Sequence, residues 1–138
     1  MTLTYGSMTG IDTNVLLRAA LQDDDVQSPL AERVLSGFTK DSPGFITMIA
    51  LVELYWTLVR KKGLDRTHAL LFIRRLVESE SLEFDDGEGV VRALTFAEEG
   101  ADFADALINS TMEQFGATET VTFDKGASER LGWKLLSA

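Results

Sequence analysis

The pattern of apolar and polar positions predicts short strands that alternate with helices. Short apolar runs bounded by turn residues predict strands at residues 8–12, 44–47, 82–84, 119–123 and 133–136. Stretches with apolar residues three or four positions apart predict helices at residues 13–21, 28–40, 48–61, 65–79, 87–99 and 102–115. Parallel strands need crossover connections, so this alternation predicts an α/β protein with a mostly parallel sheet covered on both faces.

Turn and capping residues mark the ends of several of these elements. Ser28-Pro29 predicts an N-cap followed by proline at the first helical position. Gly63, Gly100 and Gly116 each follow a helical stretch and predict its end. The acidic triplet at residues 23–25 and the acidic pair at residues 85–86 are expected to be solvated turns and caps.

The chain has the length of one ordinary domain. It contains 138 residues, with no internal repeat, low-complexity tract or proline-rich linker. We expect residues 8–138 to form a single domain. Residues 1–7 differ in character from the rest of the chain, and Gly6-Ser7-Met8 resembles a junction before a native start, so we expect a non-native or disordered leader there.

The composition restricts the chemistry that the protein can perform. Hydrophobic residues make up 45% and charged residues 25%, which is typical of a folded protein, and the formal net charge is −9. This charge disfavours generic binding to phosphate backbones or anionic membranes. With no cysteine and one histidine, His68, thiolate and His-rich metal sites are excluded, so carboxylates must carry most of any chemistry. No apolar run approaches the ~20 residues of a membrane span and no signal peptide opens the chain, so we expect a cytoplasmic protein.

Two aspartates follow predicted strands. Asp12 comes after Gly10-Ile11, and Asp124 comes after residues 121–123. Ligands of open α/β sheets bind at the carboxyl ends of the strands, which makes both residues candidate ligands. Each is equally well explained as the N-cap of the next helix.

Glu53 is the only charged residue in the apolar stretch at residues 49–59. A helix this apolar is expected to be buried on most of its circumference. A buried carboxylate needs a cation, because an unpaired one costs several kcal/mol. The alternative is that Glu53 faces a narrow solvent stripe or pairs with an arginine.

Asp102 and Asp105 lie three residues apart in a predicted helix and share a face. Asp102, in the first turn, is explained as a cap that complements the helix dipole. Asp105 precedes the apolar run at residues 106–108 and is expected to be buried, so it is the better ligand candidate. A cluster of oxygen ligands without histidine or cysteine suits a hard cation, Mg²⁺ or Mn²⁺.

These residues lie in four segments that together resemble the signatures of PIN domains, and most closely the VapC toxins of type II toxin–antitoxin systems. The segments are residues 10–18 (GIDTNVLLR), 53–58 (ELYWTL), 101–108 (ADFADALI) and 122–125 (TFDK). Their order and spacing agree from about residue 8 to the C-terminus. The main departure is the run of small residues at 126–128, after Asp124.

The resemblance implies a PIN-like three-layer α/β/α fold, with a central sheet of four to five strands, and a metal-dependent endoribonuclease. In it, Asp12, Glu53, Asp105 and Asp124 are the catalytic acids around one or two Mg²⁺ or Mn²⁺ ions, and metal-activated water attacks the RNA phosphodiester. The family pattern gives supporting roles to four further residues: Thr13 and Asn14 orient the first carboxylate, Thr122 lies near the fourth, and Asp102, which precedes the third, makes an outer or water-mediated contact.

The resemblance also implies an RNA substrate, a homodimer and a VapB-like antitoxin that covers the active site. Two alternatives remain. One is a catalytically inactive PIN-fold scaffold or RNA-binding protein, although such domains usually lack one or more of the four acids. The other is a haloacid-dehalogenase-like phosphatase, which needs a second acid two positions after the first, where this chain has Asn14.

Six of the thirteen basic residues fall within residues 60–75, where Asp65 is the only acid. This segment is interpreted either as a stripe that contacts the substrate backbone or as a solvated helix face. His68, within it, is expected at the surface. Tyr55 and Trp56 are expected to pack in the core or in a dimer interface rather than to stack on bases.

Overall fold

The computed structural model describes residues 7–137, which form two compact units. Unit 1 comprises residues 7–85 and unit 2 comprises residues 86–137. Of the predicted leader, residues 1–6 lie outside the described residues, and Ser7 is exposed. That residues 8–138 form a single domain stays a prediction.

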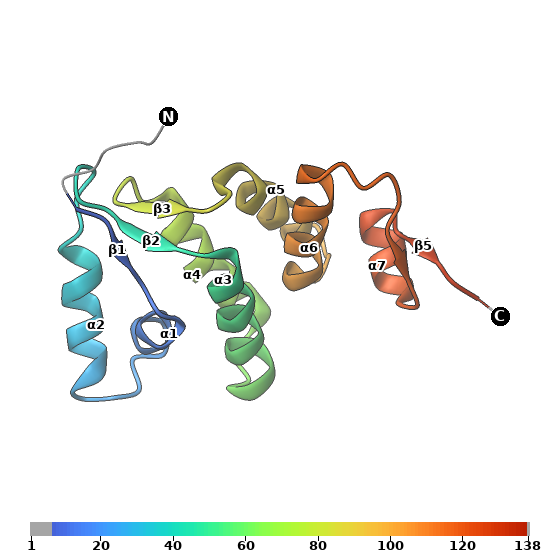
Figure 1. The fold of residues 1–138 in the computed structure, drawn as a ribbon. Coiled ribbons are helices and arrows are strands. Elements are labelled where there is room, and N and C mark those ends of the chain that lie inside the picture. Colours follow the sequence, from blue (N-terminus) through green and yellow to red (C-terminus); the bar gives the residue numbers. More distant parts are fainter. Residues whose placement is uncertain (1–6, 138) are drawn as a thin grey trace. The chain divides into compact units, whose positions relative to one another are not determined.

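Unit 1 is built on a three-stranded parallel sheet (Figure 1). Its strands are β1 (Thr9–Gly10), β2 (Gly44–Ile46) and β3 (Leu82–Phe84), in the order β1-β2-β3. Thr9 is aligned with Gly44, and Gly44 with Leu82. A Cβ on Gly44 would lie 2.6 Å from Cδ1 of Ile11, so a larger residue at this point of the central strand would displace that side chain.

Four α-helices connect these strands. They are α1 (Thr13–Leu21) and α2 (Gln27–Ser36) between β1 and β2, and α3 (Met48–Trp56) and α4 (Arg66–Glu78) between β2 and β3. Apolar side chains from the strands and helices form the core of the unit, including the fully buried Leu16, Ile46, Leu51, Leu54, Leu58 and Ile73. The boundaries of α1 agree with the prediction because Asp12 begins the helix with an extended backbone.

The predicted start and end of the second helix are wrong. Ser28 is not an N-cap: it lies inside α2, is 2% exposed, and donates a hydrogen bond from its Oγ to the carbonyl of Arg18. The orphan donors at this end are satisfied by Asp24, whose Oδ1 accepts from the backbone N–H groups of Gln27 and Val26. These two bonds hold the pKa of Asp24 below its usual value.

The helix predicted at residues 48–61 is two pieces. After α3, residues Thr57–Lys61 form a π-helical turn (η1), closed by a bond from the N–H of Lys62 to the carbonyl of Thr57. Hydrophobic periodicity carries no signal that separates a π turn from an α-helical one, so the sequence does not reveal it.

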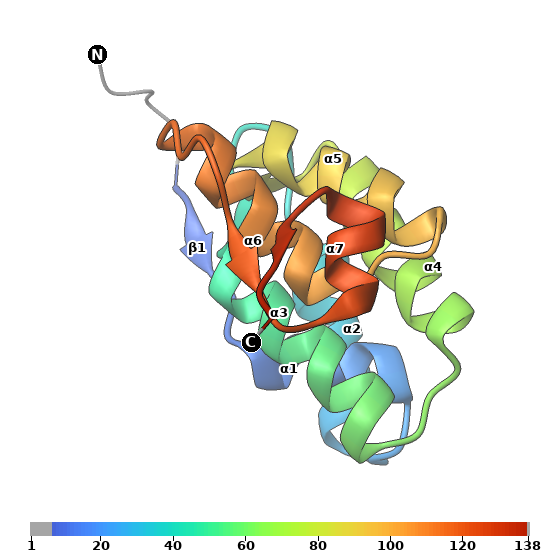
Figure 2. The same cartoon turned by 90° about the vertical axis from the view of Figure 1, so that its right-hand side faces the viewer.

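Unit 2 contains three helices and two short parallel strands. These are α5 (Gly87–Glu98), α6 (Phe103–Gln114), β4 (Val121–Thr122), α7 (Lys125–Leu131) and β5 (Lys134–Leu135). Figure 2 shows α7 beside the two strands. The core lies between α5 and α6, and it contains Val90, Leu94, Phe103 and Leu107. Gly100 and Gly116 end these helices with positive φ, as predicted.

The predicted fold class is confirmed: the protein is α/β, with parallel strands connected by helices. Residues 7–137 contain five strands, and their hydrogen bonds join them into a sheet of three in unit 1 and a sheet of two in unit 2. Among the described residues, no helix combines the length and the apolar character needed to cross a bilayer.

Candidate functional site

Asp12 lies between the first strand of unit 1 and α1, as predicted, and it is exposed. Its Oδ1 accepts a 2.9 Å hydrogen bond from the backbone N–H of Thr13. Its Oδ2 accepts a longer bond, 3.4 Å, from Nδ2 of Asn14. Both oxygens are therefore oriented by neighbours, and each keeps further lone pairs for a ligand.

Thr13 connects Asp12 to Glu53. Its side chain is 8% exposed, and its Oγ1 donates to Oε1 of Glu53 at 3.3 Å. The hydroxyl thus reaches the second acid, 40 positions away along the chain, whereas only the backbone of Thr13 reaches Asp12. One buried residue holds two of the four predicted ligands.

The expected burial of Glu53 is wrong. Glu53 is exposed, because α3 buries only the face that carries Ala50, Leu51, Leu54 and Tyr55. Ile49 and Trp56 share the opposite face with Glu53 and are 74% and 49% exposed. Some of the apolar residues of this helix are thus exposed, and hydrophobicity alone does not reveal which face is buried.

Two side chains fix the start of α3. The sequence alone does not connect either of them with the site. Oγ1 of Thr47 accepts from the N–H of Ala50 at 3.1 Å, and Oδ1 of Asp85 accepts from the N–H of Met48 at 2.9 Å. Thr47 follows β2 and Asp85 follows β3, so the carboxyl ends of two strands hold the helix that carries Glu53. The sequence pattern predicts Thr47 as part of a strand and therefore does not identify it as a cap. For Asp85, the only sequence signal of a role at the site is its position directly after a predicted strand.

In unit 2, Asp105 lies in the first turn of α6 and is partly buried. Asp102 is the N-cap of this helix, as predicted, and its Oδ2 accepts from the backbone N–H of Asp105 at 3.0 Å. Burial, followed by the charges of Asp102 and Asp124, raises the pKa of the Asp105 carboxyl. The charge on Asp105 is therefore disfavoured unless a cation is near.

Asp124 follows β4 and caps α7. Its Oδ1 accepts from the N–H of Ala127 at 3.1 Å, while its own N–H donates to Oγ1 of Thr122 at 3.0 Å. A Cβ on Gly126 would lie 3.1 Å from Oδ1 of Asp124, so the small residue leaves room for this carboxylate. Of the small residues at 126–128, Gly126 is thus the one that leaves space beside this carboxylate.

The predicted ligands thus fall into two pairs, Asp12 with Glu53 in unit 1 and Asp105 with Asp124 in unit 2. Within residues 7–137, no three histidine, aspartate or glutamate side chains are grouped as they would be around a metal ion. The donor chemistry fits a hard cation, since every candidate ligand is a carboxylate with unused lone pairs.

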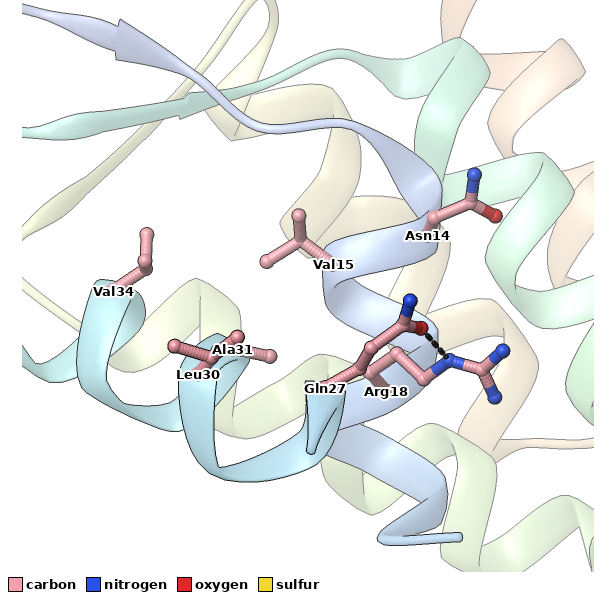
Figure 3. Close-up of a pocket in the computed structure, with 7 residues that line it drawn as sticks. All are labelled: Asn14, Val15, Arg18, Gln27, Leu30, Ala31 and Val34. Carbon is pink, nitrogen blue, oxygen red and sulfur yellow. Dashed lines mark hydrogen bonds between the residues drawn. The ribbon is translucent and has the colours of Figure 1, made fainter. Parts of the chain in front are cut away.

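A groove of ≈ 270 Å³ lies between α1 and α2 and includes Asn14, the neighbour of Asp12 (Figure 3). The α2 side is apolar, and Leu30 and Val34 on it are 47% and 48% exposed. Arg18 of α1 and Gln27 of α2 also line the groove, and Nε of Arg18 donates to Oε1 of Gln27 at 2.7 Å (Figure 3).

The basic residues of the segment at 60–75 are divided between two elements. Arg60, Lys61 and Lys62 are exposed at the end of the helix that carries Glu53, whereas Arg74 and Arg75 lie near the opposite end of α4. His68 is exposed, as predicted, and its Nδ1 lies 3.2 Å from Oδ2 of Asp65.

The two aromatic residues before this segment differ from each other. Tyr55 is buried, as predicted. Trp56 is half-exposed, so it does not pack in the core, and its expected place in a dimer interface stays a prediction. Nζ of Lys61 lies over its ring, 5.4 Å from the ring centroid.

Comparison with known proteins places the chain in a family. No curated protein matches its sequence. Among solved structures, the chain is similar to VapC20 of Mycobacterium tuberculosis, described as a toxin that cleaves the sarcin–ricin loop, with 15% identity, a TM-score of 0.44, and coverage of 94% of this chain and 98% of that one. The model of the PIN domain family matches residues 11–132, which is most of the chain. The protein therefore belongs to the PIN domain family.

Proposed function

We propose that this protein is a divalent-metal-dependent endoribonuclease and the toxin of a type II toxin–antitoxin system. PIN domains are generally ribonucleases. The observation that carries the proposal is that the family match, over residues 11–132, includes all four predicted acids: Asp12, Glu53, Asp105 and Asp124. The presence of the complete set favours catalysis over the inactive scaffold alternative.

The four carboxylates are the proposed metal ligands. When bound, Mg²⁺ or Mn²⁺ activates water and neutralises charge on the scissile phosphodiester. Thr13 holds Glu53 through its hydroxyl, and Asn14 restrains Asp12. Thr122 fixes the backbone of Asp124 through its hydroxyl, and Asp102 fixes the helix turn that carries Asp105. These four residues are positioning residues.

Replacing Asp12 or Asp105 with asparagine tests the assignment. Asparagine remains able to accept hydrogen bonds, so we expect the fold to persist. Losing a residue that only hydrogen-bonds to a metal ligand typically lowers activity about 10- to 100-fold. Losing a metal ligand itself is expected to cost more, so Mg²⁺-dependent RNA cleavage should fall by more than about 100-fold. Purified wild type, Asp12→Asn and Asp105→Asn are compared on RNA with Mg²⁺ or EDTA, and Asp41→Asn, at an exposed position without such a role, is the control. Undiminished cleavage by either site variant contradicts the assignment.

The toxin role is tested by expressing the chain with and without the protein encoded next to it. We expect the chain alone to arrest growth, and a VapB-like antitoxin to relieve the arrest. A homodimer is part of the same proposal and is measured by sedimentation. Normal growth with no RNA cut removes the support for a toxin.

A further inference from the structure

The face of α3 that carries Glu53 also presents an aromatic ring beside a group of cations. Trp56 is 49% exposed and lies three positions after Glu53, on the same side of the helix. Arg60, Lys61 and Lys62 follow it and are all exposed. Within the part of the chain that the structure describes, no acid forms an ion pair with these three cations, and the nearest acid in sequence, Asp65, pairs with His68 instead.

The π turn brings one of these cations to the ring. In an α-helix, a side chain five positions on lies roughly 140° around the axis from the first. The wider turn at Thr57–Lys61 brings the fifth residue back toward the first, and Nζ of Lys61 lies 5.4 Å from the centroid of Trp56. Half of the Trp56 surface stays open although this lysine lies over the ring.

We propose that Trp56 is a stacking platform for a nucleobase of single-stranded RNA, and that Lys61 and Arg60 contact the phosphates next to that base. Aromatic rings beside basic side chains are the common arrangement for single-stranded nucleic acid. A second copy of the chain fits the same face less well, because lysine is depleted in protein interfaces and this face would bury unpaired cations. The inference rests on the proposed function in taking RNA as the ligand.

The test uses tryptophan fluorescence, since the chain contains only Trp56 and Trp133. Trp133→Phe leaves Trp56 as the only indole, at the cost of a hydrogen bond to Asn109, so its fold is first checked by circular dichroism. Short mixed-sequence single-stranded RNA is titrated into this variant in EDTA, which prevents cleavage. We expect the RNA to quench the emission of Trp56.

Affinity measurements on full-length variants separate stacking from charge. Trp56→Ala is expected to weaken RNA binding about 5- to 150-fold, and Trp56→Phe to retain most of it. Lys61→Ala is expected to lower the slope of log affinity against log salt by about 0.7. Phe115→Ala removes an aromatic side chain that is 81% exposed at the end of α6 and is expected to change neither quantity.

RNA that binds without quenching Trp56, or with equal affinity for Trp56→Ala and wild type, overturns the inference. So does a Trp56→Ala variant that keeps its RNA affinity but turns a dimer into a monomer in sedimentation, because the face is then a protein interface. Cleavage in Mg²⁺ without quenching defeats this inference and leaves the proposed function standing. Quenching without any cleavage supports the inference and defeats the proposed function.

Discussion

Asp105 lies where its charge is costly in the absence of a cation. Partial burial disfavours the ionised form, and the carboxylates of Asp102 and Asp124 repel it, so its pKa is raised. Asp102 is held in place by its bond to the backbone of Asp105, so it cannot turn away without uncapping α6. A position that costs stability in the metal-free protein is typical of functional residues, whose replacement often stabilises a fold.

We expect Asp105→Asn to stabilise the metal-free protein at neutral pH. The raised pKa means that the folded chain holds the Asp105 proton to higher pH than the unfolded chain does. Stability is therefore lost as pH rises from the ordinary pKa of 3.8 through the raised one, and the asparagine avoids this loss. Because the side chain is only partly buried, solvent screening limits the gain to about 1–3 °C in Tm.

Thermal melts in EDTA at several pH values measure this effect. The advantage of Asp105→Asn should be present at pH 7 and disappear near pH 3. An equal advantage at both pH values would mean that something other than the Asp105 charge is responsible.

Thr13→Val tests the contact between Thr13 and Glu53. Valine keeps the shape of the buried side chain but cannot donate to Oε1 of Glu53. We expect RNA cleavage to fall about 10- to 100-fold, with a higher Mg²⁺ requirement, and Thr13→Ser to recover most of the loss. Thr67→Val, the same substitution at an exposed position on α4, is the control. Cleavage by Thr13→Val that equals wild type in rate and Mg²⁺ dependence would exclude a positioning role.

At the scale of elements, local signals predict most of the helices and strands that the structure describes, but they miss α7 (Lys125–Leu131) and some of the ends. The predicted boundaries of α1 and β3 agree with the structure because each is marked by its immediate neighbours. The start of α2 is missed because the hydroxyl of Ser28 does not cap the helix. It donates instead to the carbonyl of Arg18, ten positions earlier in the chain. The exposure of Glu53 and Trp56 is missed because it depends on which face of α3 meets the rest of unit 1.

The start of α5 gives a matched pair of glycine substitutions. A Cβ on Gly89 would lie 2.1 Å from Oδ2 of Asp86, the N-cap of this helix, whereas a Cβ on Gly87 meets nothing within 4 Å. Gly89→Ala should displace the Asp86 carboxylate from its bond to the N–H of Gly89, at a cost of about 1–2 kcal/mol. Gly87→Ala should be neutral or stabilise by up to about 1 kcal/mol. Urea denaturation measures both, and a Gly89→Ala variant as stable as wild type would show that Asp86 is not a significant cap.

At the scale of the whole molecule, the net charge of −9 has two opposite effects on binding. It disfavours indiscriminate binding to RNA, and it supplies the carboxylates that a divalent cation needs. If the four proposed ligands bind two divalent ions, the charge becomes −5. The four acids can be assigned from the sequence because their contexts match a family pattern, whereas their hydrogen-bond partners come only from the structure.

Mg²⁺ should therefore stabilise the folded protein. A free Mg²⁺ concentration about five times its Kd contributes about 1 kcal/mol, or about 2–4 °C in Tm. We expect this shift for wild type and for Asp41→Asn, and a smaller one for Asp12→Asn. NaCl at equal ionic strength controls for general screening of the acidic surface. The same shift in all three proteins would indicate screening rather than a site.

The π turn at Thr57–Lys61 has a consequence for how this protein can change in evolution. A π turn is equivalent to one residue inserted into an α-helix, so losing a single codon within it would restore an unbroken helix. Glu53 and Trp56, which precede the turn, would keep their positions. Lys61 would then be the fourth residue after Trp56, roughly 40° around the helix axis from it, and would stay on the side of the indole. One in-frame deletion could thus remove a residue from this helix without separating Lys61 from Trp56.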